Sequence, residues 1–179
     1  MNLIFKSISK ASNDLQLFNQ INIDSFPEFE RMEIDTILKF STETASDFMG
    51  IYDNDFPIGF YFLVKNKNSG YIFYYAIDQR YRSKGYGSAA LKKMIAQYKE
   101  IQLTLDFEQI DESSSNNEQR IRRKKFYLKN GLKETGHFTL LSGERFEIVC
   151  TEDEFDVNGL VEILKIIHPY CPEFPAVVL

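Results

Sequence analysis

Three apolar runs joined by short polar turns constrain the fold of this chain more than any other feature of its sequence. The runs are FMGIY, IGFYFLVK and YIFYYAI, all within residues 48–77. They are rich in aromatic and β-branched residues, and the joints between them carry the Asn, Asp and Gly typical of tight turns. Strands joined by such short turns must run antiparallel. This stretch therefore predicts a three-stranded meander.

The flanking sequence predicts a mixed α/β protein with a mostly antiparallel central sheet flanked by helices. Apolar residues at i, i+3 and i+4 indicate helices, and alternation or short apolar runs indicate strands. Besides the meander, the predicted elements are a strand at 2–8, helices around 17–21, 34–38 and 91–98, a strand at 101–107, a helix at 116–130, a hairpin of 137–141 with 145–150, and a helix around 157–167. The strand, helix and strand between 71 and 107 form a crossover.

Length and composition indicate one cytoplasmic domain. The chain has 179 residues, 44% of them hydrophobic, and no linker-like stretch. We therefore expect a single domain over 1–179, with 151–179 as a C-terminal helical extension. The net charge of -5 argues against a nucleic-acid partner. We see no secretory signal and no apolar run long enough to span a membrane.

A loop with three basic residues and two glycines separates the last strand of the meander from the next helix. It reads DQRYRSKGYGS, residues 78–88. Glycines before a helix allow the backbone to approach a ligand, and the first helical N–H groups attract anionic oxygens. The alternative is a plain strand-to-helix turn with solvated basic side chains.

The same glycines also fit a dinucleotide-binding fingerprint. Gly85, Gly87 and Ala90 satisfy G-x-G-x-x-A, and Asp106 falls where a ribose-binding acid is expected. However, the first glycine of that fingerprint directly follows its strand, whereas residues 78–84 intervene here. The strands before the loop are also predicted to be antiparallel, unlike those of a dinucleotide-binding fold.

Two motifs give the loop a sharper interpretation. RSKGYG fits Q/R-x-x-G-x-G/A, and FYLKNGLKETG at 126–136 is similar to an FYEKLGF…G segment. Both motifs, in this order of elements, resemble the GNAT superfamily of N-acetyltransferases over about residues 1–150. The resemblance implies a sheet that splays between its fourth and fifth strands, acetyl-CoA as cosubstrate without a metal, and direct attack of an amine on the thioester.

The resemblance also assigns residues to the cofactor. Backbone groups in the fourth strand would bind pantetheine and the thioester carbonyl, and loop amides would bind the pyrophosphate. The strand residues are Tyr75, Ala76 and Ile77, and the loop residues are Arg82, Ser83, Lys84, Gly85, Tyr86, Gly87 and Ser88.

Tyr127 occupies a position where the superfamily often carries its general acid, and a phenol can protonate a leaving thiolate; the alternative is a tyrosine that only packs on the helix. Some members carry a glutamate base in the fourth strand, but the corresponding residue here is Tyr71. Asp106 and Glu108 are the next candidates for the base, acting through a water, with solvated acids at a strand end as the alternative. Many members also have an asparagine seven residues before the tyrosine, where this chain has Arg120.

The partner is expected to be an amine-bearing acceptor, either a small molecule or a protein. The acids in DFEQIDE, 106–112, would attract a cationic amine, with a solvated loop as the alternative. The basic run 120–125 is expected to be a solvated helix face with Ile121 and Phe126 turned inward. The histidines and cysteines have no metal-ligand spacing. A homodimer contact remains open for the tail helix, and an acyl-CoA sensor without turnover remains an alternative function.

Overall fold

The computed structural model describes residues 1–173, and its elements follow the predicted order with one added 3-10 turn, η1. The elements are β1 (Leu3–Ser7), α1 (Leu15–Ser25), α2 (Ile34–Glu43), β2 (Ser46–Asp53), β3 (Phe56–Asn66), β4 (Ser69–Ile77), η1 (Gln79–Tyr81), α3 (Tyr86–Gln97), β5 (Gln102–Glu108), α4 (Asn117–Lys129), β6 (Lys133–Leu141), β7 (Glu144–Cys150) and α5 (Val157–Ile167).

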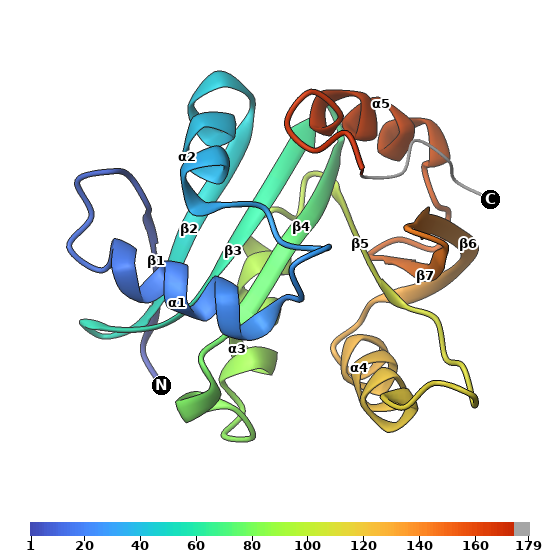
Figure 1. Cartoon of the computed structure of the whole chain (residues 1–179), viewed down its shortest axis with the longest axis horizontal. Helices are drawn as coiled ribbons and strands as arrows, with labels where there is room; N and C mark the ends of the chain where they lie inside the picture. Colours follow the sequence, from blue (N-terminus) through green and yellow to red (C-terminus); the bar gives the residue numbers. More distant parts are fainter. Residues whose placement is uncertain (174–179) are drawn as a thin grey trace. The chain divides into compact units, whose positions relative to one another are not determined.

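The sheet is mixed and mostly antiparallel, as predicted. Its strands are hydrogen-bonded in the order β1-β2-β3-β4-β5-β7-β6 (Figure 1). The antiparallel pairs are β1–β2, β2–β3, β5–β7 and β6–β7, whereas β4 and β5 are parallel. The parallel pairing joins 69–71 to 102–104.

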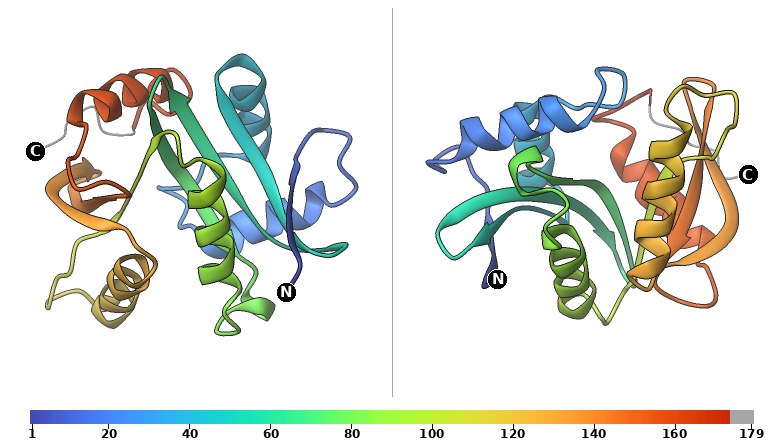
Figure 2. Two further views of the ribbon diagram at one scale, coloured as in Figure 1. Left: turned by 180° about the vertical axis from the view of Figure 1, so that it is seen from behind. Right: turned by 90° about the horizontal axis from the view of Figure 1, so that it is seen from below.

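The chain folds as two compact units, and the first comprises Met1–Lys65 with Ile72–Met94. In this unit α1 and α2 cover one face of the sheet and α3 covers the other (Figure 2). Its core is aromatic: the rings of Phe40 and Phe62 meet edge to face at 5.1 Å, and those of Phe48 and Phe60 at 5.6 Å. Such pairs account for the dense aromatic content of the meander.

The second unit comprises Asn66–Tyr71 and the chain from Ile95 onward. It holds β5, β7 and β6, with α4 packed on β5 and β6. Ser142 and Gly143 form the two-residue β6–β7 turn, with φ of 50° and 87°, as a hairpin turn of this length requires.

The predicted tail helix is α5, and it belongs to the second unit. Its apolar face is buried through Leu160, Ile163, Leu164 and Ile167. Asp156 caps it by accepting a hydrogen bond from the Gly159 N–H at 2.9 Å. The last part of the predicted extension, residues 174–179, lies outside the described residues.

Candidate active site

The loop after β4 is shaped by its own polar contacts. Asp78 accepts a hydrogen bond from the Arg80 N–H at 2.9 Å and forms an ion pair with the Arg80 guanidinium. This cation holds the pKa of the Asp78 carboxyl below its usual value. Ser83 and Gly85 then adopt positive φ values of 61° and 85°. The chain thus reverses direction before α3, and one reversal uses a glycine where an L side chain would be strained.

The start of α3 offers backbone donors. Its first helical hydrogen bond runs from the Ala89 N–H to the Gly85 carbonyl, at 3.0 Å. The amides of 86–88 precede that bond and therefore have no partner within the helix. A Cβ on Gly85 would lie in ordinary van der Waals contact with the Met1 side chain, whose Cε would be 3.5 Å away. The arrangement fits an anionic group such as a pyrophosphate.

The basic side chains of the loop already have partners in the protein. Arg82 donates from Nε to the Ile77 carbonyl at 2.8 Å and from Nη2 to Ser25 Oγ at 3.0 Å. Lys84 Nζ donates to the Arg80 carbonyl at 2.8 Å. These contacts hold the loop in shape, and the exposed amines and guanidinium groups add positive charge around the amides.

The end of β4 presents alternate backbone groups to opposite sides. The Asp78 N–H donates to the Ile58 carbonyl of β3 at 2.9 Å, and the Ala76 carbonyl would lie 2.3 Å from a Cβ on Gly59 of β3. Because the direction alternates along a strand, the backbone groups of Tyr75 face away from β3. Ala76 faces β3. The Ile77 carbonyl also faces away, but it is bonded to Arg82 as described above.

In the second unit, Asp106 lies between two hydroxyl donors. Tyr71 Oη donates to Asp106 Oδ1 at 2.8 Å, and the Thr139 hydroxyl donates to Oδ2. Burial raises the pKa of the Asp106 carboxyl, although both hydroxyl donors act in the opposite direction. A carboxyl with a raised pKa is a better proton acceptor near neutral pH than an ordinary aspartate.

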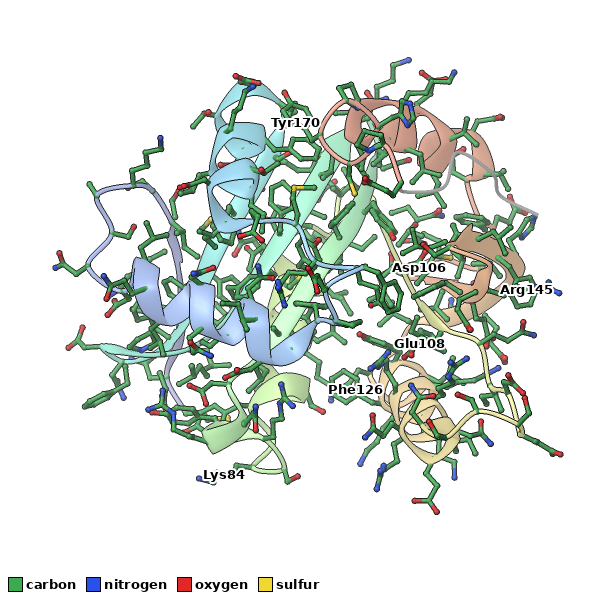
Figure 3. All side chains as sticks on the ribbon, in the orientation of Figure 1. Lys84, Asp106, Glu108, Phe126, Arg145 and Tyr170 are labelled. Carbon is green, nitrogen blue, oxygen red and sulfur yellow. The ribbon has the colours of Figure 1, made fainter. Side chains whose placement is uncertain are left out.

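Glu108 lies two residues further along β5 and nearer to α4 (Figure 3). Its carboxylate forms an ion pair with Arg123 and accepts a hydrogen bond from Asn116 Nδ2 at 2.9 Å. A second cation, Arg120, lies nearby, with its Nη2 3.8 Å from Glu108 Oε1. The Glu108 side chain is 13% exposed. The two acids of β5 therefore lie in different environments: Asp106 between two hydroxyl donors, and Glu108 beside two guanidinium groups.

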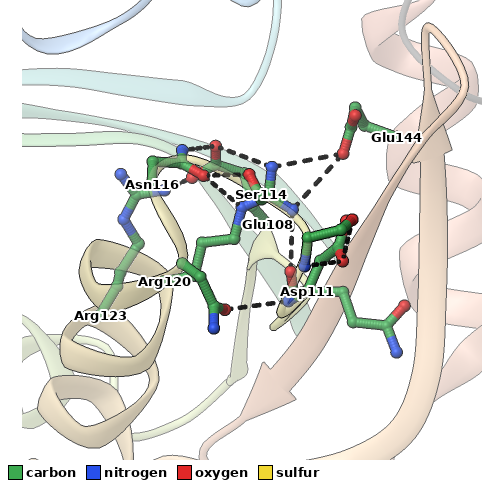
Figure 4. A network of polar contacts seen from close by, with 10 residues as sticks. Glu108, Asp111, Ser114, Asn116, Arg120, Arg123 and Glu144 are labelled. Atoms are coloured by element: carbon green, nitrogen blue, oxygen red, sulfur yellow. Dashed lines mark hydrogen bonds and ion pairs between the residues drawn. The ribbon is translucent and has the colours of Figure 1, made fainter.

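Arg120 forms the centre of the network at the start of α4 (Figure 4). The residue is 6% exposed. Its Nε donates to Asn116 Oδ1 at 2.8 Å and its Nη1 to the Gln109 carbonyl at 2.9 Å, while Glu144 lies 3.4 Å away. The expectation of a fully solvated basic face is therefore wrong at this position. These three partners, together with the Glu108 carboxylate, compensate the buried charge.

Tyr127 is held by β5. Its half-buried ring stacks on Phe107, with centroids 5.3 Å apart and planes 26° from parallel. Burial raises the pKa of the Tyr127 phenol, the Arg123 cation lowers it, and the Asp106 carboxyl raises it. The phenol is therefore protonated at neutral pH, as a general acid must be.

Within residues 1–173, no group of three or more His, Cys, Asp or Glu side chains is arranged to hold a metal ion. Neither cysteine forms a disulfide; Cys150 is buried and Cys171 is half-buried. His137 packs edge-on against Phe155. In the same part of the chain, no helix is both long and apolar enough to cross a lipid bilayer.

Comparison with known proteins agrees with this architecture. The model of the acetyltransferase (GNAT) family matches residues 15–131, which is more than half of the chain. The chain belongs to the GNAT acetyltransferase family and is an acyltransferase. No curated protein sequence matches it significantly. The antiparallel β2 and β3, together with this family, overturn the dinucleotide-binding alternative.

Solved structures share the fold. A protein from Bacteroides thetaiotaomicron described as a GNAT-family acetyltransferase has a TM-score of 0.71 at 21% identity, covering 94% of this chain and 98% of its own. The ribosomal-protein-S18-alanine N-acetyltransferase of Escherichia coli has a TM-score of 0.60 at 16% identity, covering 86% of this chain and 96% of its own. A spermidine N-acetyltransferase SpeG chimera from Vibrio cholerae and hSSAT has a TM-score of 0.62 at 14% identity, covering 84% of this chain and 95% of its own.

Sequence reasoning missed the partners of the two β5 acids. Tyr71 stands where a base was sought, yet it serves as a donor to Asp106, and Thr139 comes from β6. The sequence predicts Arg123 on a solvated helix face, yet it forms an ion pair with Glu108. For Tyr71 the sequence did contain a signal, because the parallel strands of the predicted crossover would place this residue beside β5.

Proposed function

We propose that this protein is an N-acetyltransferase that transfers the acetyl group of acetyl-CoA to an amine. The observation that carries the proposal is the row of amides at the start of α3 that have no partner within the helix, next to the positive φ values of Ser83 and Gly85, in a member of the GNAT family. In this proposal, amides from Arg82 to Ser88 bind the pyrophosphate. Of the strand residues first assigned to pantetheine, Tyr75 has the most suitable backbone orientation.

The proposed reaction is a direct displacement. The amine nitrogen attacks the thioester carbonyl carbon, the carbon–sulfur bond breaks, and the amide product forms. The protonated amine loses one proton to Asp106 before it attacks, and its nitrogen loses a second proton to solvent as the amide forms. The leaving thiolate receives a proton from Tyr127, so that free CoA carries a thiol, and the phenol is then reprotonated from solvent. A lysine-like amine has a reference pKa of about 10.4, so it needs a base or a desolvating site to attack at neutral pH.

We propose Asp106 as the base in preference to Glu108. Burial raises the pKa of the Asp106 carboxyl, whereas Glu108 is held by Arg123 and Asn116. Asp106→Asn is expected to lower turnover by about 100-fold or more, which is the usual contribution of a general base. Removal of a merely structural carboxyl would leave the pH dependence of turnover unchanged.

The acceptor is proposed as an amine on a small molecule or a protein. The two named structural neighbours act on spermidine and on the alanine of ribosomal protein S18, and both of these acceptors are amines. The acids at 106–112 support a cationic acceptor through long-range attraction, although Asp106 and Glu108 are largely engaged within the protein. We further propose a cytoplasmic protein in which residues 1–179 act as one domain and α5 belongs to a C-terminal extension.

The test begins with the thermal midpoint in the presence of acetyl-CoA, with NADH and NADPH as controls. A ligand at 100 times its Kd adds about 2.7 kcal/mol of stability, so acetyl-CoA alone should raise the midpoint. No rise at saturating acetyl-CoA would refute the proposed cofactor. Acetylation of a panel of amines then follows, with Tyr127→Phe compared against Tyr98→Phe. The first variant should lose turnover with unchanged acetyl-CoA binding, and the second should keep both.

A further inference from the structure

Arg123 lies in α4 one helical turn before Tyr127, and it forms an ion pair with Glu108 of β5. We propose that Arg123 is a positioning residue for Tyr127, and that Glu108 determines how much of the Arg123 charge acts on the phenol. This inference rests on the proposed function, in which Tyr127 protonates the leaving thiolate. It gives Glu108 a role different from that of a general base.

The geometry follows from the spacing along α4 and β5. Arg123 and Tyr127 are four residues apart, which places them on the same side of the helix. Arg123 Nη1 contacts Glu108 Oε2, and the Tyr127 ring stacks on Phe107. Two consecutive residues of β5 therefore hold two consecutive turns of α4. The cation is fixed to the strand at a point next to the ring that supports the phenol.

The charges around Tyr127 come from every element packed against α4. β5 contributes Asp106 and Glu108, and the first of these raises the pKa of the phenol while Arg123 lowers it. Glu134 of β6 and Glu147 of β7 are both ion-paired with Lys124. Glu144, also in β7, pairs with Arg120. The cation that acts on Tyr127 is thus Arg123, and its nearest counter-charge is Glu108.

Opposite effects are expected from removing the two partners. Arg123→Gln removes the cation, so the phenol should ionise at higher pH and become a weaker acid. Glu108→Gln leaves the cation without its counter-charge, so the phenol should ionise at lower pH. Arg123→Lys keeps the charge and should restore behaviour close to wild type. A purely structural ion pair would instead make both neutral variants change in the same direction.

The closing experiment measures ionisation without turnover. The full-length protein is prepared with 3-fluorotyrosine in place of tyrosine, and the ¹⁹F resonance of residue 127 is assigned from its absence in Tyr127→Phe. A pH titration of the cofactor-free protein then follows the phenol in wild type, R123Q, E108Q and R123K. The Arg123 side chain is 40% exposed, and in R123Q Glu108 keeps the Asn116 amide and Arg120 as neighbours; circular dichroism of each variant checks that it is folded before the titration. Shifts of opposite sign in R123Q and E108Q support the inference; equal or absent shifts overturn it.

Turnover separates this inference from the proposed function. R123Q is expected to lose about tenfold in kcat at neutral pH, less than the loss of about 100-fold or more expected when a general acid is removed. The alkaline limb of the kcat profile should move in the same direction as the titration. If the titration shifts as expected while Tyr127→Phe retains full turnover, the electrostatic coupling holds and the acid role of Tyr127 fails.

Discussion

Replacement of Arg120 by methionine tests the network at the start of α4. The substitution keeps a long apolar stem and removes the guanidinium. Two charge-assisted hydrogen bonds are lost, to Asn116 Oδ1 at 2.8 Å and to the Gln109 carbonyl at 2.9 Å. Glu108, which is 13% exposed, loses one of its two cationic neighbours. The variant therefore leaves a nearly buried carboxylate and two polar acceptors with fewer partners.

The cost follows from the burial of these groups. Removing one member of a buried ion pair destabilises a protein by about 3–5 kcal/mol, because the other charge remains buried. For chains of 150–250 residues, each 1 kcal/mol lowers the thermal midpoint by about 2–4 °C. Arg120→Met is therefore expected to lower the midpoint by about 6–20 °C.

Arg122→Met is the matched control. Arg122 lies on the same helix and is exposed, so its substitution should change stability by no more than about 0.5 kcal/mol. Both variants are unfolded by heat and by urea and followed by circular dichroism. Equal midpoints for the two variants would show that the buried network contributes no net stability, which would refute the reasoning.

Three further predictions concern the cores of the two units. Burial raises the pKa of Tyr52 to about 12 from its ordinary 10, so its contribution to stability is complete below pH 10 and disappears as the pH rises through 12; urea unfolding of Tyr52→Phe should lack this alkaline loss. Gly59→Ala should cost about 1–3 kcal/mol in urea unfolding, because the new Cβ would meet the Ala76 carbonyl at 2.3 Å; an unchanged midpoint would contradict this. Because the pKa of Asp106 is raised in the folded state, its contribution to stability is complete at low pH and is lost as the pH rises through that value. Asp106→Asn should therefore gain stability relative to wild type as the pH rises from 4 to 8, as measured by thermal midpoints, and a parallel pH dependence of the two proteins would rule this out.

The local patterns predicted more of the fold than of the site. The meander, the crossover helix and the tail helix all appear where the periodicity placed them, because each depends on side-chain spacing within one element. The helix predicted at 116–130 is α4, with Asn116 as its N-cap and Gly131 at a φ of 97° just past its end. Caps and turns are local, so a single sequence can indicate them.

The sequence also predicts a turn between β4 and α3, because its glycines and the first turn of α3 are adjacent in the chain. The partners of the basic residues in this loop could not be predicted. Whether Arg82 binds a ligand or the Ile77 carbonyl depends on how the loop turns back on the strand, and composition does not record that direction.

The sequence was sufficient to indicate the element order, the antiparallel meander and the glycine-containing loop before α3, because these depend on residues close together along the chain. The different environments of Asp106 and Glu108 required contacts between residues far apart. Both acids lie in β5, two positions apart, but one lies between the hydroxyls of Tyr71 and Thr139 and the other between arginines of α4. Burial and charge pairing, which set proton affinity, arise only when β4, β6 and α4 pack around that strand.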